Sequence, residues 1–215
     1  MIRADLHVHT EYSIDSVTTL DQVIESCSHK GINCVAIADH GTIQGALKLK
    51  SIAPFYVIIA EEILTPYGEV MGMFLEEEIP SHLSLEETIE RIKDQGALLN
   101  IPHPFDRVRL SAFKQKGLQK VMPFVDIIEV YNARSLSPGD QVKAQKLALK
   151  YETMKSAGSD AHTPDEIGNA YVEMKEFNNK SEFLEALKYG EITGHKSNPL
   201  VHFTSTLNKL KKRFA

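Results

Sequence analysis

The chain alternates between short continuous apolar runs and longer stretches in which apolar positions recur three or four residues apart. Such runs have the length of buried strands, and such stretches have the periodicity of amphipathic helices. The pattern predicts strands at residues 2–6, 33–38, 55–63, 97–101, 126–130, 153–158 and 170–174. It predicts helices at residues 20–30, 44–50, 85–95, 111–120, 138–151 and 181–189, and a terminal amphipathic helix in the last dozen residues.

Local signals mark several of these boundaries. Thr18-Thr19 can cap the first helix, and Gly31 can end it. The segment Ser84–Glu87 has the residue types of a capping box. Thr65–Gly68 is a turn signal, so residues 69–75 can return as a hairpin partner of the third strand.

Acids and imidazoles recur just after the predicted strands. His7 and His9 end the first strand, and an extended backbone would direct both imidazoles, together with Asp5, to one face. Two imidazoles on one face can bind a divalent cation. An isolated His-x-His sequence is, however, more often just two polar residues at the end of a strand. Because other strands end in the same way, we favour a multi-metal site at one end of a parallel barrel. The further candidates are Asp15, Asp39, His40, Glu61, Glu62, His103, Asp160 and His162.

Strands and helices that alternate along a chain form a parallel sheet with right-handed crossovers. Both an open doubly wound sheet and a closed barrel have this order. An open sheet places its site at one switch point, whereas a barrel brings all its strand ends to one mouth. Because the candidates follow six strand ends, we expect an α/β fold: a seven-stranded (β/α)7 barrel. We expect residues 1–215 to form this single domain, with the metal site at the C-terminal mouth of the strands.

Composition narrows the class of protein. Of the 215 residues, 42% are hydrophobic and 25% are charged, as in soluble globular domains. No apolar run approaches the roughly 20 residues of a membrane span, and the first strand leaves no room for a signal peptide. We expect Cys27 and Cys34 to be reduced thiols in a cytoplasmic protein. A net charge of −5 argues against a protein that coats nucleic acid, although bound cations would still admit a nucleic-acid substrate.

Six motifs carry a resemblance to a known family. They are Asp5-Leu-His-Val-His-Thr-x-Tyr-Ser-x-Asp15, Ala38-Asp-His-Gly41, Glu62, Ile101-Pro-His-Pro104, Glu129-Val-Tyr-Asn132 and Gly158-Ser-Asp-Ala-His162. In kind and in order, over about three quarters of the chain, they resemble the PHP (polymerase and histidinol phosphatase) superfamily. The resemblance implies a distorted seven-stranded barrel that holds two or three divalent metals and hydrolyses phosphate esters. Mixed imidazole and carboxylate ligands suit manganese, iron or zinc.

The resemblance also implies a ligand set, carried over position by position. His7, His9, Glu62 and Asp160 resemble the ligands of one metal, and Asp15, His40 and His162 those of a second. Glu62 would bridge to a third metal shared with His103.

Two features qualify this assignment. Neighbouring strand residues point to opposite faces, so only one of Glu61 and Glu62 can line the site, and the spacing favours Glu62. Glu129 and Asn132 occupy the place where some relatives carry a histidine or cysteine for the third metal. We therefore expect the third site to be weak or empty.

Several other residues have two open interpretations. Together with Asp15 and His40, Arg134 is expected to act in catalysis: its guanidinium could bind a phosphate through two donors, or it could lie on the surface. Arg107 and Arg109 are phosphate candidates for which a surface position is favoured. Asp5 could orient an imidazole or be a solvated acid. Surface positions are expected for His29 and His82, and a site role for His195 is disfavoured.

The leading function is metal-dependent hydrolysis of a phosphomonoester, or of a 5′ phosphate ester of a short nucleic acid, by a metal-activated water. A histidinol-phosphate phosphatase is an alternative. A metal-dependent amidohydrolase is disfavoured. Such enzymes usually add a lysine that bridges the metals, and no lysine ends a central strand here. A metal-binding regulatory domain without turnover is disfavoured because this chain keeps its ligands. The expected partner is a small phosphorylated substrate or a short nucleic acid. We expect no association with a membrane, and the oligomeric state is left open.

Overall fold

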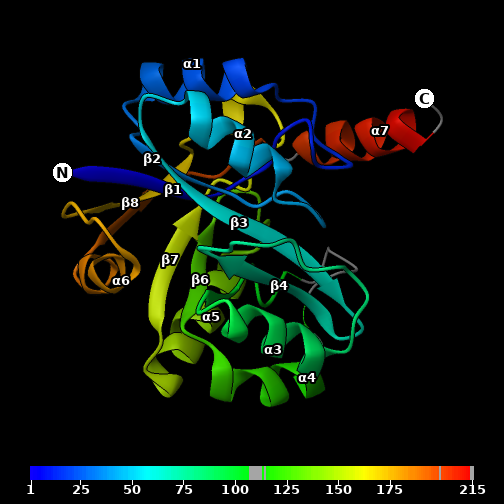
Figure 1. Ribbon diagram of the computed structural model, residues 1–215, viewed down its shortest axis with the longest axis vertical. Coiled ribbons are helices and arrows are strands. Elements are labelled where there is room, and N and C mark those ends of the chain that lie inside the picture. The colour runs from blue at the N-terminus through cyan, green and yellow to red at the C-terminus, as the bar shows by residue number, and fades with distance from the viewer. Residues whose placement is uncertain (107–112, 114, 199, 214–215) are drawn as a thin grey trace.

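A nine-stranded sheet forms the centre of the computed structural model, which describes residues 1–106, 113, 115–198 and 200–213 (at 115, 202–204, 210, 211 and 213 the backbone alone). The sheet curls (Figure 1) until the segment that follows the edge strand ending at Gly158 meets the C-terminal end of the strand that begins the chain. Ala161 bridges Val8 there, and the His9 N–H donates to the Ala161 carbonyl at 2.9 Å. In sheet order the strands are β7 (Met154–Gly158), β6 (Ile127–Asn132), β5 (Leu98–Ile101), β4 (Gly68–Met73), β3 (Tyr56–Thr65), β2 (Cys34–Ile37), β1 (Ile2–Val8), β8 (Ala170–Met174) and β9 (Glu191–Gly194).

The prediction of an α/β fold with a barrel-like sheet is confirmed, but the strands differ from a (β/α)7 barrel in number and direction. The sets β1–β2–β3 and β5–β6–β7 are parallel. Strand β4 lies antiparallel between them, so residues 69–75 contribute a barrel strand and not only a hairpin arm. Strand β8, predicted as the seventh parallel strand, pairs antiparallel with the first half of β1, and β9 extends that edge.

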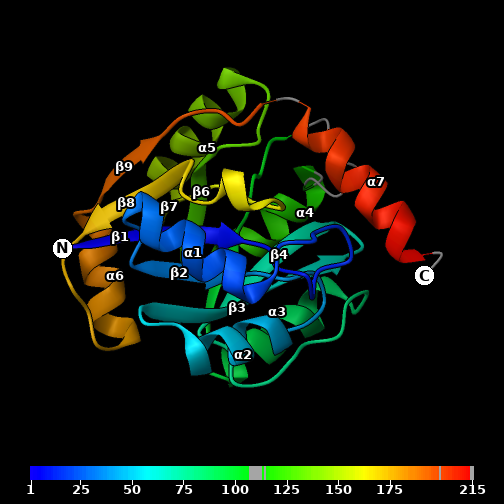
Figure 2. The same ribbon diagram turned by 90° about the horizontal axis from the view of Figure 1, so that it is seen from above.

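Helices cover the outside and both ends of this sheet. Thr19 caps the first helix through a reciprocal capping box with Gln22, and Gly31 ends it in the left-handed conformation, as the sequence predicts. Figure 2 shows α6 and α7 at opposite ends of the sheet, with α7 at the end toward which β1 points. The helices are α1 (Leu20–Lys30), α2 (Gln44–Ile52), α3 (Leu85–Asp94), α4 (Gln115–Val121), α5 (Pro138–Tyr151), α6 (Lys180–Lys188) and α7 (Val201–Arg213), with 3₁₀ turns η1 (Met122–Phe124) and η2 (Pro164–Glu166).

Small and branched side chains alternate along β2, where they lie on opposite faces of the sheet. Along β2, Cys34 and Ala36 join an inner cluster with Leu6 and Phe183, whereas Val35 and Ile37 pack outward in the cluster of α1 and α2. Small inner residues leave room for the curled sheet to close, and branched outer residues fill the contact with the helices. Both cysteines are buried and free. No helix in the described ranges is long and apolar enough to cross a membrane.

Candidate metal centre

The structure brings all eight predicted metal ligands to the end of the barrel where the parallel strands finish. They form overlapping groups in which the ligand atoms lie within 4.8 Å of one another. Six of the eight are buried, and the other two, Asp15 and His40, are partly exposed. The groups are His9, Asp15, His40 and His162; His7, Glu62 and His103; His7, His9 and Asp160; and His40, Glu62 and Glu69.

Glu62 lies at the centre of these groups. Its Oε1 is 2.9 Å from His103 Nε2. Its Oε2 is 3.5 Å from His7 Nε2, 3.4 Å from His9 Nε2 and 3.4 Å from His40 Nδ1. Although buried, Glu62 Oε2 accepts no hydrogen bond from the described part of the chain. One carboxylate oxygen therefore faces three imidazole nitrogens without a bonding partner.

A second set of side chains lies on the open side of the mouth. Asp15 Oδ1 is 3.2 Å from His162 Nε2, and Asp15 Oδ2 is 3.4 Å from His40 Nε2. Ser13 holds the loop that carries Asp15: its hydroxyl is 3.1 Å from His9 Nδ1 and 3.3 Å from Asp15 Oδ1. This is the predicted second ligand set, with His9 as an additional neighbour.

Glu69 is a site residue that the sequence analysis missed. Its Oε1 lies 3.7 Å from His40 Nδ1, and the side chain is buried. Residue 69 pairs with Leu64 in the β3–β4 hairpin, beyond Glu62 on the mouth side. Because β4 runs back toward the barrel, its first residues, and not its last, lie at the mouth. The turn signal just before Glu69 was the available indication.

A carboxylate orients His7, and it comes from Glu129 and not from Asp5, for which this role was one of two open interpretations. Glu129 Oε1 lies 3.0 Å from His7 Nδ1, which leaves His7 Nε2 directed at the centre. The other oxygen of Glu129 accepts the His103 N–H at 2.7 Å and an Asn132 amide N–H at 2.9 Å. Such a contact fixes the tautomer of a metal-binding imidazole and raises its basicity.

Asp5 does not share the face of His7 and His9, and that prediction is wrong. A bulge in β1 is the reason: Asp5 pairs with Val35 and Val8 with Ile37, so three steps along β1 match two along β2. Asp5 is fully buried, and its carboxylate accepts the backbone N–H groups of Ser159 at 2.9 Å and Gly168 at 2.8 Å. Burial raises the pKa of Asp5 to about 6. The residue connects β1 to the segment that carries Asp160 and is not a solvated acid.

Glu61 and Glu62 lie on opposite faces of β3, as alternation predicts. Glu61 points away from the centre, and its Oε2 accepts the Ile79 N–H at 2.9 Å. Burial raises the pKa of Glu61 to about 8. Glu62 therefore faces the metal-ligand groups, whereas the adjacent Glu61 faces away from them. Substitution of Glu61 is accordingly a suitable control for substitution of Glu62.

Unusual backbone conformations occur in the segments that follow β7 and β5, both of which come close to the centre. Asp160 and His103 adopt positive φ angles of 55° and 29°, which residues other than glycine rarely adopt. The Asp160 N–H donates to the His7 carbonyl at 2.7 Å, which holds that turn in place. At Gly158 a Cβ would lie 2.3 Å from the Cβ of His7, so glycine is required for this approach.

Charge in the centre favours a bound cation. Burial alone lowers the pKa of His7, but Asp160, Glu129 and Glu62 together raise it well above its usual value. The same balance, with Glu62 and Asp15 as the main partners, raises the pKa of His40 to about 10. The carboxylates therefore stabilise positive charge at these ring nitrogens. Either protons or metal ions can supply that charge. Metal binding at such a site releases protons.

The donor atoms also have the spacing of a metal site. Ligands of a tetrahedral zinc ion, each about 2.0–2.1 Å from it, lie about 3.3 Å apart. His7 Nε2 and His9 Nε2 are 3.1 Å apart, and each lies 3.4–3.8 Å from Glu62 Oε2 and Asp160 Oδ1. The residues present therefore fit divalent ions in composition and in distance.

Arg134 is buried, with 3% of its surface exposed, so the alternative of a surface arginine is wrong. Its Nη2 donates to the Val201 carbonyl at 2.9 Å and to the Ser205 hydroxyl at 2.7 Å. Its Nε lies 3.3 Å from Glu166 Oε1, and its Nη1 contacts His162 Nδ1. This guanidinium connects the His162 segment to α7, and phosphate binding by it remains a prediction.

The remaining candidates are not among the metal-ligand groups of the described residues. Arg107 and Arg109 fall outside the described residues. His29, His82 and His195 are exposed, as expected for the first two. Asp39 supports the centre indirectly. Its carboxylate accepts two hydrogen bonds from Thr10, the residue after His9: one from the backbone N–H at 2.6 Å and one from the side-chain hydroxyl at 2.7 Å.

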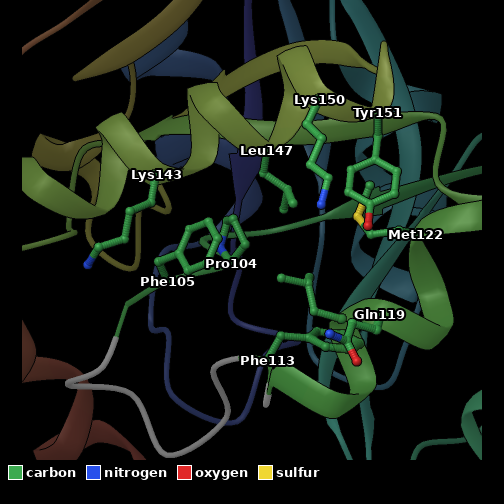
Figure 3. Close-up of a pocket in the computed structure, with 10 residues that line it drawn as sticks. Pro104, Phe105, Phe113, Gln119, Met122, Lys143, Leu147, Lys150 and Tyr151 are labelled. Carbon is green, nitrogen blue, oxygen red and sulfur yellow. The ribbon is translucent and has the colours of Figure 1, made fainter.

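A cavity of about 490 Å³ lies between α5 and the α4–η1 segment (Figure 3). Pro104 and Phe105, which directly follow His103, form one wall, and Leu147, Lys150 and Tyr151 lie opposite. None of its lining residues belongs to the metal-ligand groups. The cavity is therefore a neighbour of the centre and not part of it.

Sequence comparisons find relatives of the whole chain. Residues 140–192 match the PHP-associated family. Uncharacterized protein MJ0417 of Methanocaldococcus jannaschii is 37% identical over 211 residues, which cover 93% of this chain and 85% of that protein.

Solved structures with the same fold are more distant in sequence. A two-domain protein of Bacteroides vulgatus, described as containing a predicted PHP-like metal-dependent phosphoesterase, superposes with a TM-score of 0.72 at 17% identity. The match covers 90% of this chain and 65% of that one, so the chain spans about two thirds of it. An amidohydrolase of Chromobacterium violaceum, solved with bound sulfate and no metal, gives a TM-score of 0.65 at 16% identity over 89% of this chain and 97% of that one.

Proposed function

Because the chain belongs to the PHP superfamily, we propose that it is a metal-dependent phosphoesterase that hydrolyses a phosphomonoester or a 5′ phosphate ester of a short nucleic acid. One observation carries the proposal. The buried Oε2 of Glu62 has no hydrogen-bond partner in the described residues, and imidazole nitrogens of His7, His9 and His40 lie 3.4–3.5 Å away. A buried carboxylate oxygen left in this way is costly unless a cation completes its surroundings.

The ligand atoms divide between the ions as follows. His7, His9, Glu62 and Asp160 would hold one ion, and Asp15, His40 and His162 a second. His103 and the other oxygen of Glu62 would hold a third, for which His7 is the further neighbour within reach. When bound, such ions lower the pKa of a coordinated water and neutralise charge on a phosphoryl group.

The protein's own residues would prepare this chemistry. Glu129 keeps the His7 Nε2 lone pair directed inward, and Ser13 does the same for His9. Among the ligands, Asp15 and His40 are the partly exposed pair, so the substrate phosphate would enter at their side. Arg134, next to His162, would add positive charge near the phosphate, and we retain it as a candidate in catalysis.

The test is a substrate panel with purified protein that has been stripped of metal and reloaded with manganese, iron or zinc. It contains phosphomonoesters including histidinol phosphate, phosphodiesters, short 5′-phosphorylated oligonucleotides and simple amides. We expect metal-dependent release of inorganic phosphate from at least one phosphate ester, and no turnover in the stripped protein. Cleavage of amides alone would instead favour an amidohydrolase. Metal binding without turnover on any of them would favour a regulatory domain.

A further inference from the structure

Helix α7 extends across the mouth of the barrel. At its end, Lys212 Nζ donates to the carbonyl oxygens of Glu11 at 2.5 Å and Ser13 at 2.7 Å, in the loop between His9 and Asp15. At its start, Val201 and Ser205 accept hydrogen bonds from Arg134. The helix thus connects the exits of two strands that lie on different sides of the centre. Figure 2 shows it beyond the C-terminal end of β1.

The face of α7 that meets the barrel is polar after its first residue. Ser205, Asn208 and Lys212 follow Val201 at positions i+4, i+7 and i+11, which lie on the same face of a helix, and Val201 contributes its backbone carbonyl. On another face Leu207 is 57% exposed. A helix that only completed the core would have Leu207 turned inward and polar residues such as Asn208 turned outward. This arrangement indicates that the inward face meets polar groups.

Asn208 is the member of this face that lacks a partner. The residue is 6% exposed, and its Nδ2 donates no hydrogen bond to any atom of the described residues. Burying an amide without a partner costs about 1–3 kcal/mol, so such a group in a native fold requires an explanation.

The neighbours of Asn208 on the helix indicate where its amide lies. Ser205, one turn earlier, contacts Arg134, whose Nη1 reaches His162. Lys212, one turn later, binds the carbonyl of Ser13, whose hydroxyl contacts Asp15. Asn208 therefore lies on α7 between the residue that contacts Arg134 and the residue that contacts the Ser13 loop, on the side of the centre where Asp15 is partly exposed.

We propose that α7 is the roof of the substrate site and that Asn208 donates a hydrogen bond from its side-chain amide to a phosphoryl oxygen of the substrate. The inference rests on the proposed phosphoesterase function and adds a substrate-binding residue to it. A neutral amide can donate to a phosphate oxygen without competing for the metals. A helix across the mouth also selects a terminal phosphate group, which can enter beneath it, over an internal phosphodiester of a long chain.

The test compares Asn208→Ala and Asn208→Asp with Leu207→Ala, a control at the adjacent but outward position. Binding of inorganic phosphate to the metal-loaded protein is measured by calorimetry, and kcat/KM is measured on the best phosphomonoester. We expect Asn208→Ala to weaken phosphate binding roughly tenfold to a hundredfold, by the loss of a hydrogen bond to a charged group. Asn208→Asp should weaken it further, because a carboxylate repels phosphate. Leu207→Ala should match the wild type in both measurements.

Metal content and the Tm of the phosphate-free protein separate binding from structure. Metal content should equal the wild-type value in both Asn208 variants. The Tm of Asn208→Ala should not fall, because the substitution removes a buried amide that has no partner, whereas Asn208→Asp should lower Tm by burying a carboxylate. If both variants bind phosphate as the wild type does, or if Asn208→Ala loses phosphate only together with metal or with a lower Tm, the assignment of Asn208 is overturned while the phosphoesterase proposal stands. If the loaded wild type neither binds phosphate nor hydrolyses any ester, both proposals fall.

Discussion

Glu62 Oε1 lies 2.9 Å from His103 Nε2, and this contact joins the second half of β3 to the exit of β5 across the intervening antiparallel strand β4. The two residues are 41 positions apart in the chain and both are buried. Because the second oxygen of Glu62 faces three other histidines, one carboxylate reaches donor atoms from both halves of the barrel. The proposed metal centre depends on that carboxylate.

The loss of single ligands should abolish turnover without unfolding the protein. We expect His40→Ala and Asp160→Asn to reduce kcat to background, since each removes one metal ligand at the barrel mouth, where stability depends least on individual side chains. His29→Ala, at an exposed position of α1, is the control and should retain full activity. Circular dichroism and metal analysis accompany the kinetics. Near-native turnover of either ligand variant at low metal concentration would show that the ligand assignment is wrong.

Replacing Glu129 of β6 and Asp5 of β1 by their amides should have different effects. Glu129→Gln weakens the support of His7, and we expect metal affinity to fall about tenfold to a hundredfold. Asp5→Asn places an amide against the N–H groups of Ser159 and Gly168, and we expect it to cost about 1–3 kcal/mol of unfolding free energy. Metal titration and urea unfolding of both variants test this. A loss of metal affinity in Asp5→Asn without destabilisation would contradict the separation of roles.

Arg134→Ala should lower stability first. The substitution leaves Glu166 buried without its guanidinium, so we expect a loss of about 3–5 kcal/mol in unfolding free energy, with metal content unchanged. The control is Arg91→Ala, whose exposed pair with Glu87 should contribute less than about 1 kcal/mol.

If the Arg134 guanidinium also contacts the phosphate, kcat/KM of the folded variant should fall roughly tenfold to a hundredfold. Arg134→Lys should then restore only part of it, because lysine lacks the paired donors. An unchanged kcat/KM in Arg134→Ala would leave phosphate binding to the metals and to α7.

The thiols should report unfolding. Burial raises the pKa of Cys27 to about 12 and raises that of Cys34 further above its usual value. Both thiols are therefore protonated and inaccessible in the native protein, and a disulfide reagent at pH 8 should label neither until urea unfolds the chain. Because the folded state opposes ionisation, stability is constant below the pKa of an unfolded thiol, about 8.5, and falls as the pH rises above it. Rapid labelling of native protein would contradict this burial.

The sequence predicted most of what depends on local periodicity. The positions of β1 to β8, the end of α1 at Gly31 and the choice of Glu62 over Glu61 all follow from spacings within a few residues, whereas β9 was not predicted. The location of the ligands at one mouth follows from a single further assumption, that parallel strands end on the same side.

What the sequence could not supply depends on contacts between distant segments. Asp5 changed faces because β1 takes an extra residue opposite β2, and no local signal marks that bulge. Glu69 lies at the centre because β4, expected only as a hairpin partner of β3, is an antiparallel strand of the barrel itself. The hydrogen-bond partners of Arg134 on α7 lie 67 and 71 positions away, beyond any local pattern.

The most direct measurement is the number of divalent ions that the chain binds. Wild-type protein, Glu62→Gln and Glu61→Gln are purified without chelators, reloaded with manganese or zinc, and analysed for bound metal per chain. We expect at least two ions in the wild type and in Glu61→Gln, whose carboxylate faces away from the centre, and fewer in Glu62→Gln. One ion or none in the wild type, or an unchanged stoichiometry and affinity in Glu62→Gln, would contradict the account.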